Sequence, residues 1–142
     1  MKVVLDTSTL IAAHISRAGV CSELMEDVLL HHELVLSEYI LEELARTLRD
    51  KFEYPERDVR AVFAFLKGAC LLVEPASLPP DSCRDPRDIP ILGTAVAGDA
   101  DLLVTVDRDL LTLGSFRHIP IVKPGQFWQQ GTAGEDLVPP TM

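Results

Sequence analysis

The sequence predicts an α/β protein in which a parallel sheet is covered by helices on both faces. Short apolar runs typical of buried strands alternate along the chain with longer amphipathic segments typical of helices. Hydrophobic residues make up 47% of the chain and aromatic residues only 6%, which favours an aliphatic core. The 142 residues suit one domain, large enough to bury about two-thirds of the surface of its unfolded chain.

Five runs are predicted to be strands because they consist almost wholly of aliphatic residues and are bounded by polar or turn-forming residues. They are residues 2–5, 34–36, 70–73, 102–105 and 119–122. Right-handed crossovers leave few topologies for such a sheet. In open α/β sheets, ligands bind outside the carboxyl ends of the strands, where the strand order reverses. Because acidic residues follow the first and fourth strands, this rule favours placing these two strands side by side.

Helices are predicted between the strands. Ser37 is a suitable N-cap for a helix that runs to about Lys51, and Pro55 and Gly68 mark the start and end of the next. Asp88 begins a further helix, and Gly98 ends it. The remaining predicted helical segments are residues 7–14, 20–32 and 109–113, with a last turn around 126–128.

Residues 1–130 are predicted to form a single domain, and the Gly- and Pro-rich residues 131–142 a disordered tail. The net charge of −9 argues against a broad basic face for duplex DNA. It does not exclude nucleic acid at a metal site, because a cation neutralises clustered carboxylates. No signal peptide is expected before the first strand, and no apolar run reaches the ~18 residues needed to cross a membrane. A cytoplasmic protein without membrane attachment is therefore expected.

Acidic residues follow the first and fourth predicted strands. A carboxylate at the position of Asp6, beside strands covered on both faces, is costly unless a cation or hydrogen-bond donors meet it. Asp107 and Asp109 follow the fourth strand. Helix capping is the alternative role for Asp6 and for one of the two acids Asp107 and Asp109. It explains the presence of both acids after the fourth strand less well.

Two predicted helices add further acids. Asp88 lies on the inward face of its helix, although it could be a simple N-cap, and Asp85 is interpreted as an ordinary turn residue. Glu42 and Glu43 both flank the apolar stripe of their helix, and the pattern does not choose between them. Acids from two strand ends and two helices suit a hard cation such as Mg²⁺. Metal ions in such a site can promote an in-line phosphoryl displacement.

Several segments resemble the PIN domain, specifically the stand-alone prokaryotic branch of toxins from toxin–antitoxin pairs (VapC-like). The resemblance covers about residues 2–128, in the family's order. It rests on Val-Val-Leu-Asp-Thr-Ser from Val3, and on residues 37–44, 85–92, 103–111 and 121–127. It implies a three-layer α/β/α fold with a parallel five-stranded sheet in the order 3-2-1-4-5. It also implies an endoribonuclease that depends on Mg²⁺ or Mn²⁺.

The resemblance also implies roles for individual residues. Asp6, Glu43, Asp88 and Asp107 match the family's acidic quartet, with Asp6, Asp88, Asp107 and Asp109 as metal ligands and Thr7, Ser8 and Thr105 as supporting residues. This match favours Glu43 over Glu42. The chain departs from the family at Ser8, where the family has Asn. A hydroxyl can still bond a neighbouring carboxylate, but it is shorter and has a single donor.

The expected partners follow from the same resemblance. They are an RNA substrate, single-stranded or structured, a cognate antitoxin protein and a second copy of the chain in a homodimer. The positive net charge expected of an antitoxin segment would complement the −9 charge of this chain. Candidate contacts to RNA phosphates are Arg17, Lys51, Arg84, Arg87 and Arg108.

Two other interpretations of the sequence remain. In a receiver-like signalling module, Thr105 and the Lys123-Pro124 pair would follow the fourth and fifth strands, as they do here. However, Asp6 lacks the acidic neighbour that such a module needs, and the third strand ends at Glu74. The second alternative is a non-catalytic PIN-like scaffold that binds RNA.

Overall fold

The computed structural model describes residues 1–16 and 19–129, which form a sheet in the order β3-β2-β1-β4-β6-β5. Every pairing among the first five of these strands is parallel. The five predicted strands and their order are thus confirmed. They are β1 (Lys2–Leu5), β2 (Glu33–Leu36), β3 (Leu71–Leu72), β4 (Leu102–Val104) and β6 (Ile119–Val122).

The sheet departs from the prediction at one edge, where a sixth strand, β5 (Ser115–Phe116), pairs antiparallel with β6. The turn between the two strands is Arg117-His118, and both residues have positive φ, 48° and 71°. Two-residue hairpins favour this conformation, which Asn-Gly usually supplies. Arg-His carries no such signal, so the sequence does not reveal the hairpin and a wholly parallel sheet is wrong at this edge.

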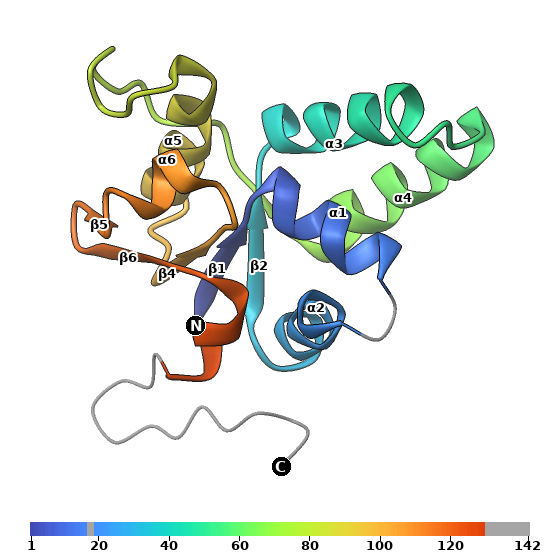
Figure 1. The fold of residues 1–142 in the computed structure, drawn as a ribbon, viewed down its shortest axis with the longest axis horizontal. Helices are drawn as coiled ribbons and strands as arrows, with labels where there is room; N and C mark the ends of the chain where they lie inside the picture. The colour runs from blue at the N-terminus through green and yellow to red at the C-terminus, as the bar shows by residue number, and fades with distance from the viewer. Residues whose placement is uncertain (17–18, 130–142) are drawn as a thin grey trace.

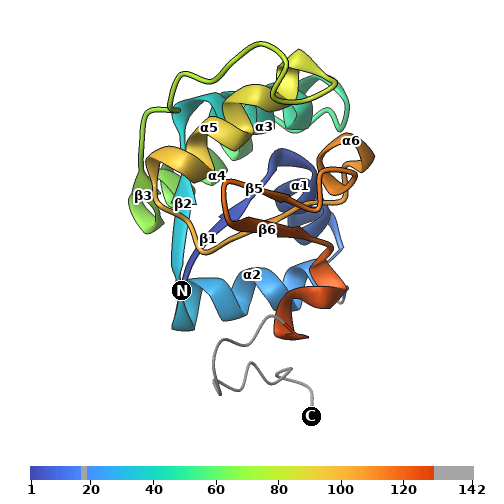
Figure 2. The ribbon, with the colours of Figure 1, turned by 90° about the vertical axis from the view of Figure 1, so that its left-hand side faces the viewer.

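Helices cover the sheet on both sides, as predicted. Figure 2 shows α5 on one side of the strands and α2 on the other, whereas Figure 1 shows α3 and α4 packed as a pair beside α1. The helices are α1 (Thr7–Ile15), α2 (Val20–His31), α3 (Glu38–Asp50), α4 (Glu56–Ala69), α5 (Ile89–Ala97) and α6 (Arg108–Leu111), with 3-10 turns η1 (Pro86–Asp88) and η2 (Pro124–Gln129).

The core forms around the two central strands. Val3, Val4 and Leu5 of β1 are fully buried, as are Leu103 and Val104 of β4. These strands are continuous apolar runs because helices cover both of their faces. The Asp6 N–H donates to the carbonyl of Val104 at 3.2 Å, which joins the carboxyl ends of β1 and β4. The residues that follow the two strands are therefore neighbours.

Gly93 allows α5 to lie close to the segment that follows β3. A Cβ atom at this position would come within 2.5 Å of the Ala76 carbonyl oxygen. The Ala76 N–H donates to the Gly93 carbonyl at 2.9 Å and holds this approach. The contact positions the start of α5, where Asp88 lies.

The predicted tail, residues 131–142, lies outside the described residues. Among the residues that are described, the helices are too short or too polar to cross a bilayer.

Candidate metal centre

Asp6 lies at the carboxyl end of β1, where its exposed fraction is only 2%. Its Oδ1 accepts hydrogen bonds from the Ser8 hydroxyl at 2.8 Å and the Thr9 N–H at 3.0 Å. The Thr105 hydroxyl donates to Oδ2. Burial raises the pKa of the Asp6 carboxyl group, and these hydrogen bonds partly offset the rise. Asp6 caps α1, but the donors around it also hold the carboxylate rigidly at the carboxyl end of β1.

Thr105 connects the acids of the two strands. Besides donating to Asp6, its hydroxyl accepts the Asp107 N–H at 2.9 Å. The Asp107 carboxylate in turn caps α6 by accepting the Asp109 N–H at 3.3 Å. The short segment after β4 thereby links Asp6 to Asp107 through Thr105, and Asp107 in turn to Asp109.

Asp88 is the least satisfied acid of this region. It lies at the junction of η1 and α5 with an exposed fraction of 9%, and its side chain does not cap α5. Among residues 1–16 and 19–129, no group forms a hydrogen bond to its buried Oδ2. Burial, followed by the adjacent Asp107 carboxyl group and then the Asp85 and Asp6 charges, raises the pKa of Asp88 from 3.8 to about 8. A bound cation would offset the repulsion between these carboxylates and would supply a contact to Asp88 Oδ2.

The structure separates the two glutamates of α3. The Oε1 atom of Glu43 accepts a hydrogen bond from the Thr7 hydroxyl at 2.6 Å, which directs Glu43 towards the start of α1. Glu42 is exposed instead and lines a groove between α3 and α4 together with Arg46 and Arg49. Only Glu43 therefore lies on the side of α3 that contacts α1.

Asp85 joins the cluster although the sequence suggests only a turn. Asp85, Asp88 and Asp109 each offer a carboxylate oxygen within 4.8 Å of the others. Asp85 also has the turn role, because it accepts the Arg87 N–H at 3.0 Å at the start of η1. Its place three residues before Asp88, at the start of a segment that resembles the PIN family, is the sequence signal that could have marked it.

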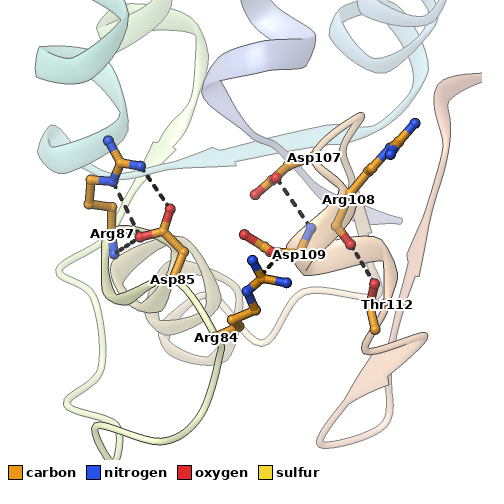
Figure 3. Close-up of polar contacts among 7 residues, drawn as sticks. All are labelled: Arg84, Asp85, Arg87, Asp107, Arg108, Asp109 and Thr112. Carbon is orange, nitrogen blue, oxygen red and sulfur yellow. Dashed lines mark hydrogen bonds and ion pairs between the residues drawn. The ribbon is translucent and has the colours of Figure 1, made fainter.

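Two arginines border the acids (Figure 3). Arg87 forms an ion pair with Asp85 at 3.0 Å, and it holds the pKa of Asp85 below its ordinary value. The Arg84 Nε atom lies 3.8 Å from Asp109 Oδ1. Arg108 extends away from the acids in the same view. Arg17 lies outside the described residues.

The carboxylates described above match the coordination preferences of a hard divalent cation. Carboxylate oxygens are the ligands that Mg²⁺ and Mn²⁺ prefer, and they come here from separate elements of a rigid fold. The buried Asp88 Oδ2 atom, which has no hydrogen-bond partner among the residues that the structure describes, points to a cation site more directly than the acidic cluster does.

Comparisons with known proteins agree with the fold. A family model described as PIN domain matches residues 2–109. Similar solved structures include two toxin–antitoxin complexes. One is VapBC2 from Rickettsia felis bound to a DNA fragment from its promoter, with a TM-score of 0.63, 12% identity and coverage of 87% of this chain and 98% of that chain. The other is VapBC-1 from nontypeable Haemophilus influenzae, with a TM-score of 0.60, 15% identity and coverage of 88% and 99%. No curated protein matches by sequence.

Proposed function

Because the chain belongs to the PIN domain family, we propose that it is a metal-dependent endoribonuclease that hydrolyses RNA phosphodiester bonds. One observation carries the proposal. The carboxyl ends of β1 and β4 and the start of α5 bring acids together around the Asp88 oxygen, which is buried and has no hydrogen-bond partner in the described part of the chain. Family membership also sets aside the receiver-like interpretation.

Asp6, Asp88, Asp107 and Asp109 would hold Mg²⁺ or Mn²⁺. When bound, such an ion makes a water molecule more acidic and stabilises negative charge on the phosphoryl oxygens. The chain itself supplies rigid ligands. Asp6 is held by its hydrogen bonds with Ser8, Thr9 and Thr105, so its oxygens are positioned before a substrate arrives.

Glu43 is proposed to orient the attacking water and to accept its proton. Its Oε1 is occupied by the Thr7 hydroxyl at 2.6 Å, which fixes the side chain and leaves Oε2 for this task. Thr7 therefore positions Glu43, whereas Ser8 and Thr105 position Asp6. The Ser8 hydroxyl bonds the neighbouring carboxylate although the family has Asn at this position.

We also propose that the chain is the toxin of a toxin–antitoxin pair, acting on RNA in the cytoplasm. The two similar structures are both VapBC complexes, which is the support from the comparisons. A cleft of about 660 Å³ between α1, α2, α3 and α4 is a candidate site for an apolar antitoxin helix. Its lining includes Leu10, Met25, Leu29, Leu30 and Phe65. Leu30 and Phe65 are 69% and 59% exposed, which is unusual for large apolar side chains.

A homodimer is a further part of the proposal, and sedimentation of the purified chain would test it. The apolar faces of α2 and α4 are largely part of the core, since Leu24, Val59 and Leu66 are buried. The exposed residues of the same two helices could still contribute to a dimer interface.

The activity is tested by incubating the purified protein with labelled single-stranded RNA, and separately with single-stranded DNA, in Mg²⁺ or Mn²⁺. We expect RNA fragments that form only with metal and that EDTA suppresses. RNA that stays intact in molar excess of enzyme, with manganese present, would favour the non-catalytic scaffold.

A further inference from the structure

We propose that Arg87 binds a phosphate of the RNA strand beside the metal centre, and that Asp85 is the residue that positions it. This inference rests on the proposed nuclease function. It selects one of the candidate cations of the chain, and it gives Asp85 a role other than that of metal ligand.

Arg87 is held at more than one point. Its Nε and Nη2 atoms donate to the two carboxylate oxygens of Asp85 at 3.2 and 3.0 Å. Its own N–H donates to Asp85 at 3.0 Å, and its carbonyl accepts the Tyr39 hydroxyl at 2.7 Å. An exposed arginine normally loses side-chain entropy when it binds a ligand. These contacts fix Arg87 beforehand, so less entropy is lost when a phosphate binds.

The fixed guanidinium still has donors to offer. The Arg87 side chain is 81% exposed, and Nη1 is not one of the nitrogens bound to Asp85. Figure 3 shows the third nitrogen pointing away from that carboxylate. A guanidinium bound in this way can still donate to phosphate oxygens, which are its best-matched ligands.

The position of Arg87 matches the path of a substrate. It is adjacent in sequence to Asp88, and Tyr39 links it to α3, the helix that carries Glu43. A strand whose scissile phosphate lies among the acids would place a neighbouring phosphate at this rim. Two other candidate cations, Arg84 and Arg108, are less well placed to bind such a phosphate. Arg84 has one contact of 3.8 Å with Asp109, and Arg108 extends away from the acids in Figure 3.

Binding of a labelled single-stranded RNA, measured by fluorescence anisotropy over a series of salt concentrations, tests the role of Arg87. The Asp6→Asn background prevents cleavage during the titration. Arg87→Gln should raise Kd about tenfold. It should also reduce the slope of log K against log salt by about 0.7, the change expected when one phosphate contact to a single strand is lost. The Arg87→Lys protein should keep the salt slope but bind RNA more weakly, because lysine retains the positive charge and lacks the paired N–H donors of the planar guanidinium group.

Arg57→Gln is the matched control. Arg57 is also an exposed arginine beside an aspartate, with its Nε 3.9 Å from Asp58 Oδ1, but it lies at the start of α4. This variant should change neither Kd nor the salt slope. In the active protein, Arg87→Gln should raise KM with little change in kcat, as expected for uniform substrate binding.

Manganese titration of the wild-type background tests the role of Asp85. Asp85→Asn keeps an acceptor for the Arg87 N–H but loses the ion pair, so it should weaken RNA binding about threefold and leave Mn²⁺ affinity unchanged. Asp88→Asn should lower Mn²⁺ affinity about 10- to 100-fold. A comparable loss in Asp85→Asn would make Asp85 a metal ligand and overturn its positioning role.

The remaining outcomes distinguish the two proposals. If the Asp6→Asn protein binds RNA and the wild type cleaves it, yet Arg87→Gln retains both Kd and salt slope, the assignment of Arg87 alone is wrong. If the wild type neither binds nor cleaves RNA, the nuclease proposal fails and the assignment of Arg87 fails with it.

Discussion

Glu43 and Glu42 are adjacent residues of α3 with different surroundings, which makes them a matched pair for mutation. Glu43 accepts a hydrogen bond from Thr7 beside the acids, whereas Glu42 is exposed on the groove towards α4. Glu43→Gln should lower the rate of RNA cleavage at least about 100-fold, because a positioned proton acceptor is lost. Glu42→Gln should leave the rate within about twofold, since a solvated glutamate has no such role. Equal losses in the two variants, measured under single-turnover conditions, would remove Glu43 from the mechanism.

Asp88 should make the stability of the metal-free protein depend on pH. Its pKa is about 8 in the folded chain, against an ordinary value of 3.8. Between these pH values the folded state keeps a proton that the unfolded state has lost, so stability falls as pH rises. In EDTA, Tm should therefore decrease from pH 5 to pH 8, and Asp88→Asn should weaken this decrease. A wild-type Tm that is flat or rises over this range would contradict the assignment.

Individual site residues were predictable from the sequence to different degrees. Asp6 and Asp107 follow apolar strands, so their place beyond the carboxyl ends of these strands could be derived from the sequence pattern alone. Glu43 could not, because helical periodicity puts Glu42 equally near the apolar stripe and only the contact with Thr7 separates the two. The sequence predicts only a turn role for Asp85, because its proximity to Asp109 depends on how the loop before η1 folds.

At the scale of elements, the packing of α5 against the segment after β3 is a testable feature. Gly93→Ala would place a Cβ atom 2.5 Å from the Ala76 carbonyl oxygen. Backbone must then shift, which should cost about 1–3 kcal/mol of unfolding free energy. Because α5 begins next to Asp88, cleavage activity should fall as well.

Gly68→Ala is the control for this substitution. Gly68 lies near the end of α4, and an added Cβ atom would meet nothing within 4 Å. This change should stabilise the protein by up to about 1 kcal/mol, because alanine favours the helix over glycine. Urea unfolding of both variants measures the difference. Similar effects of the two substitutions would show that α5 is not packed as described.

Most elements could be predicted, because strands and helices differ in the period of their apolar residues. The exception is β5, which consists of Ser115 and Phe116 and follows Gly114, whose φ is 73°. Two residues cannot establish a period. The turn after them uses Arg117 and His118 at positive φ, a conformation that the two-residue connection between β5 and β6 requires although neither residue favours it locally.

At the scale of the whole molecule, the apolar cleft and the acidic centre are separate surfaces. The cleft is lined by Phe65, whereas Phe52 is 41% exposed outside it. If the cleft receives an antitoxin helix, Phe65→Asp should weaken that complex at least about tenfold and leave RNA cleavage by the free chain intact. Phe52→Asp should change neither property. Affinity for the cognate antitoxin, measured by calorimetry, tests this. Unchanged affinity in Phe65→Asp would place the partner elsewhere.

The measurement that most directly tests the central claim is a time course of RNA cleavage in manganese by three proteins. They are the wild type, Asp6→Asn and Asp101→Asn. Asp101 is an exposed acid that accepts the Lys2 N–H at 2.8 Å at the opposite ends of the strands, so it controls for the loss of a carboxylate as such. We expect wild type and Asp101→Asn to cleave RNA alike, EDTA to stop both, and Asp6→Asn to be inactive although folded. Cleavage by Asp6→Asn at the wild-type rate would contradict the acidic centre as the site of the reaction.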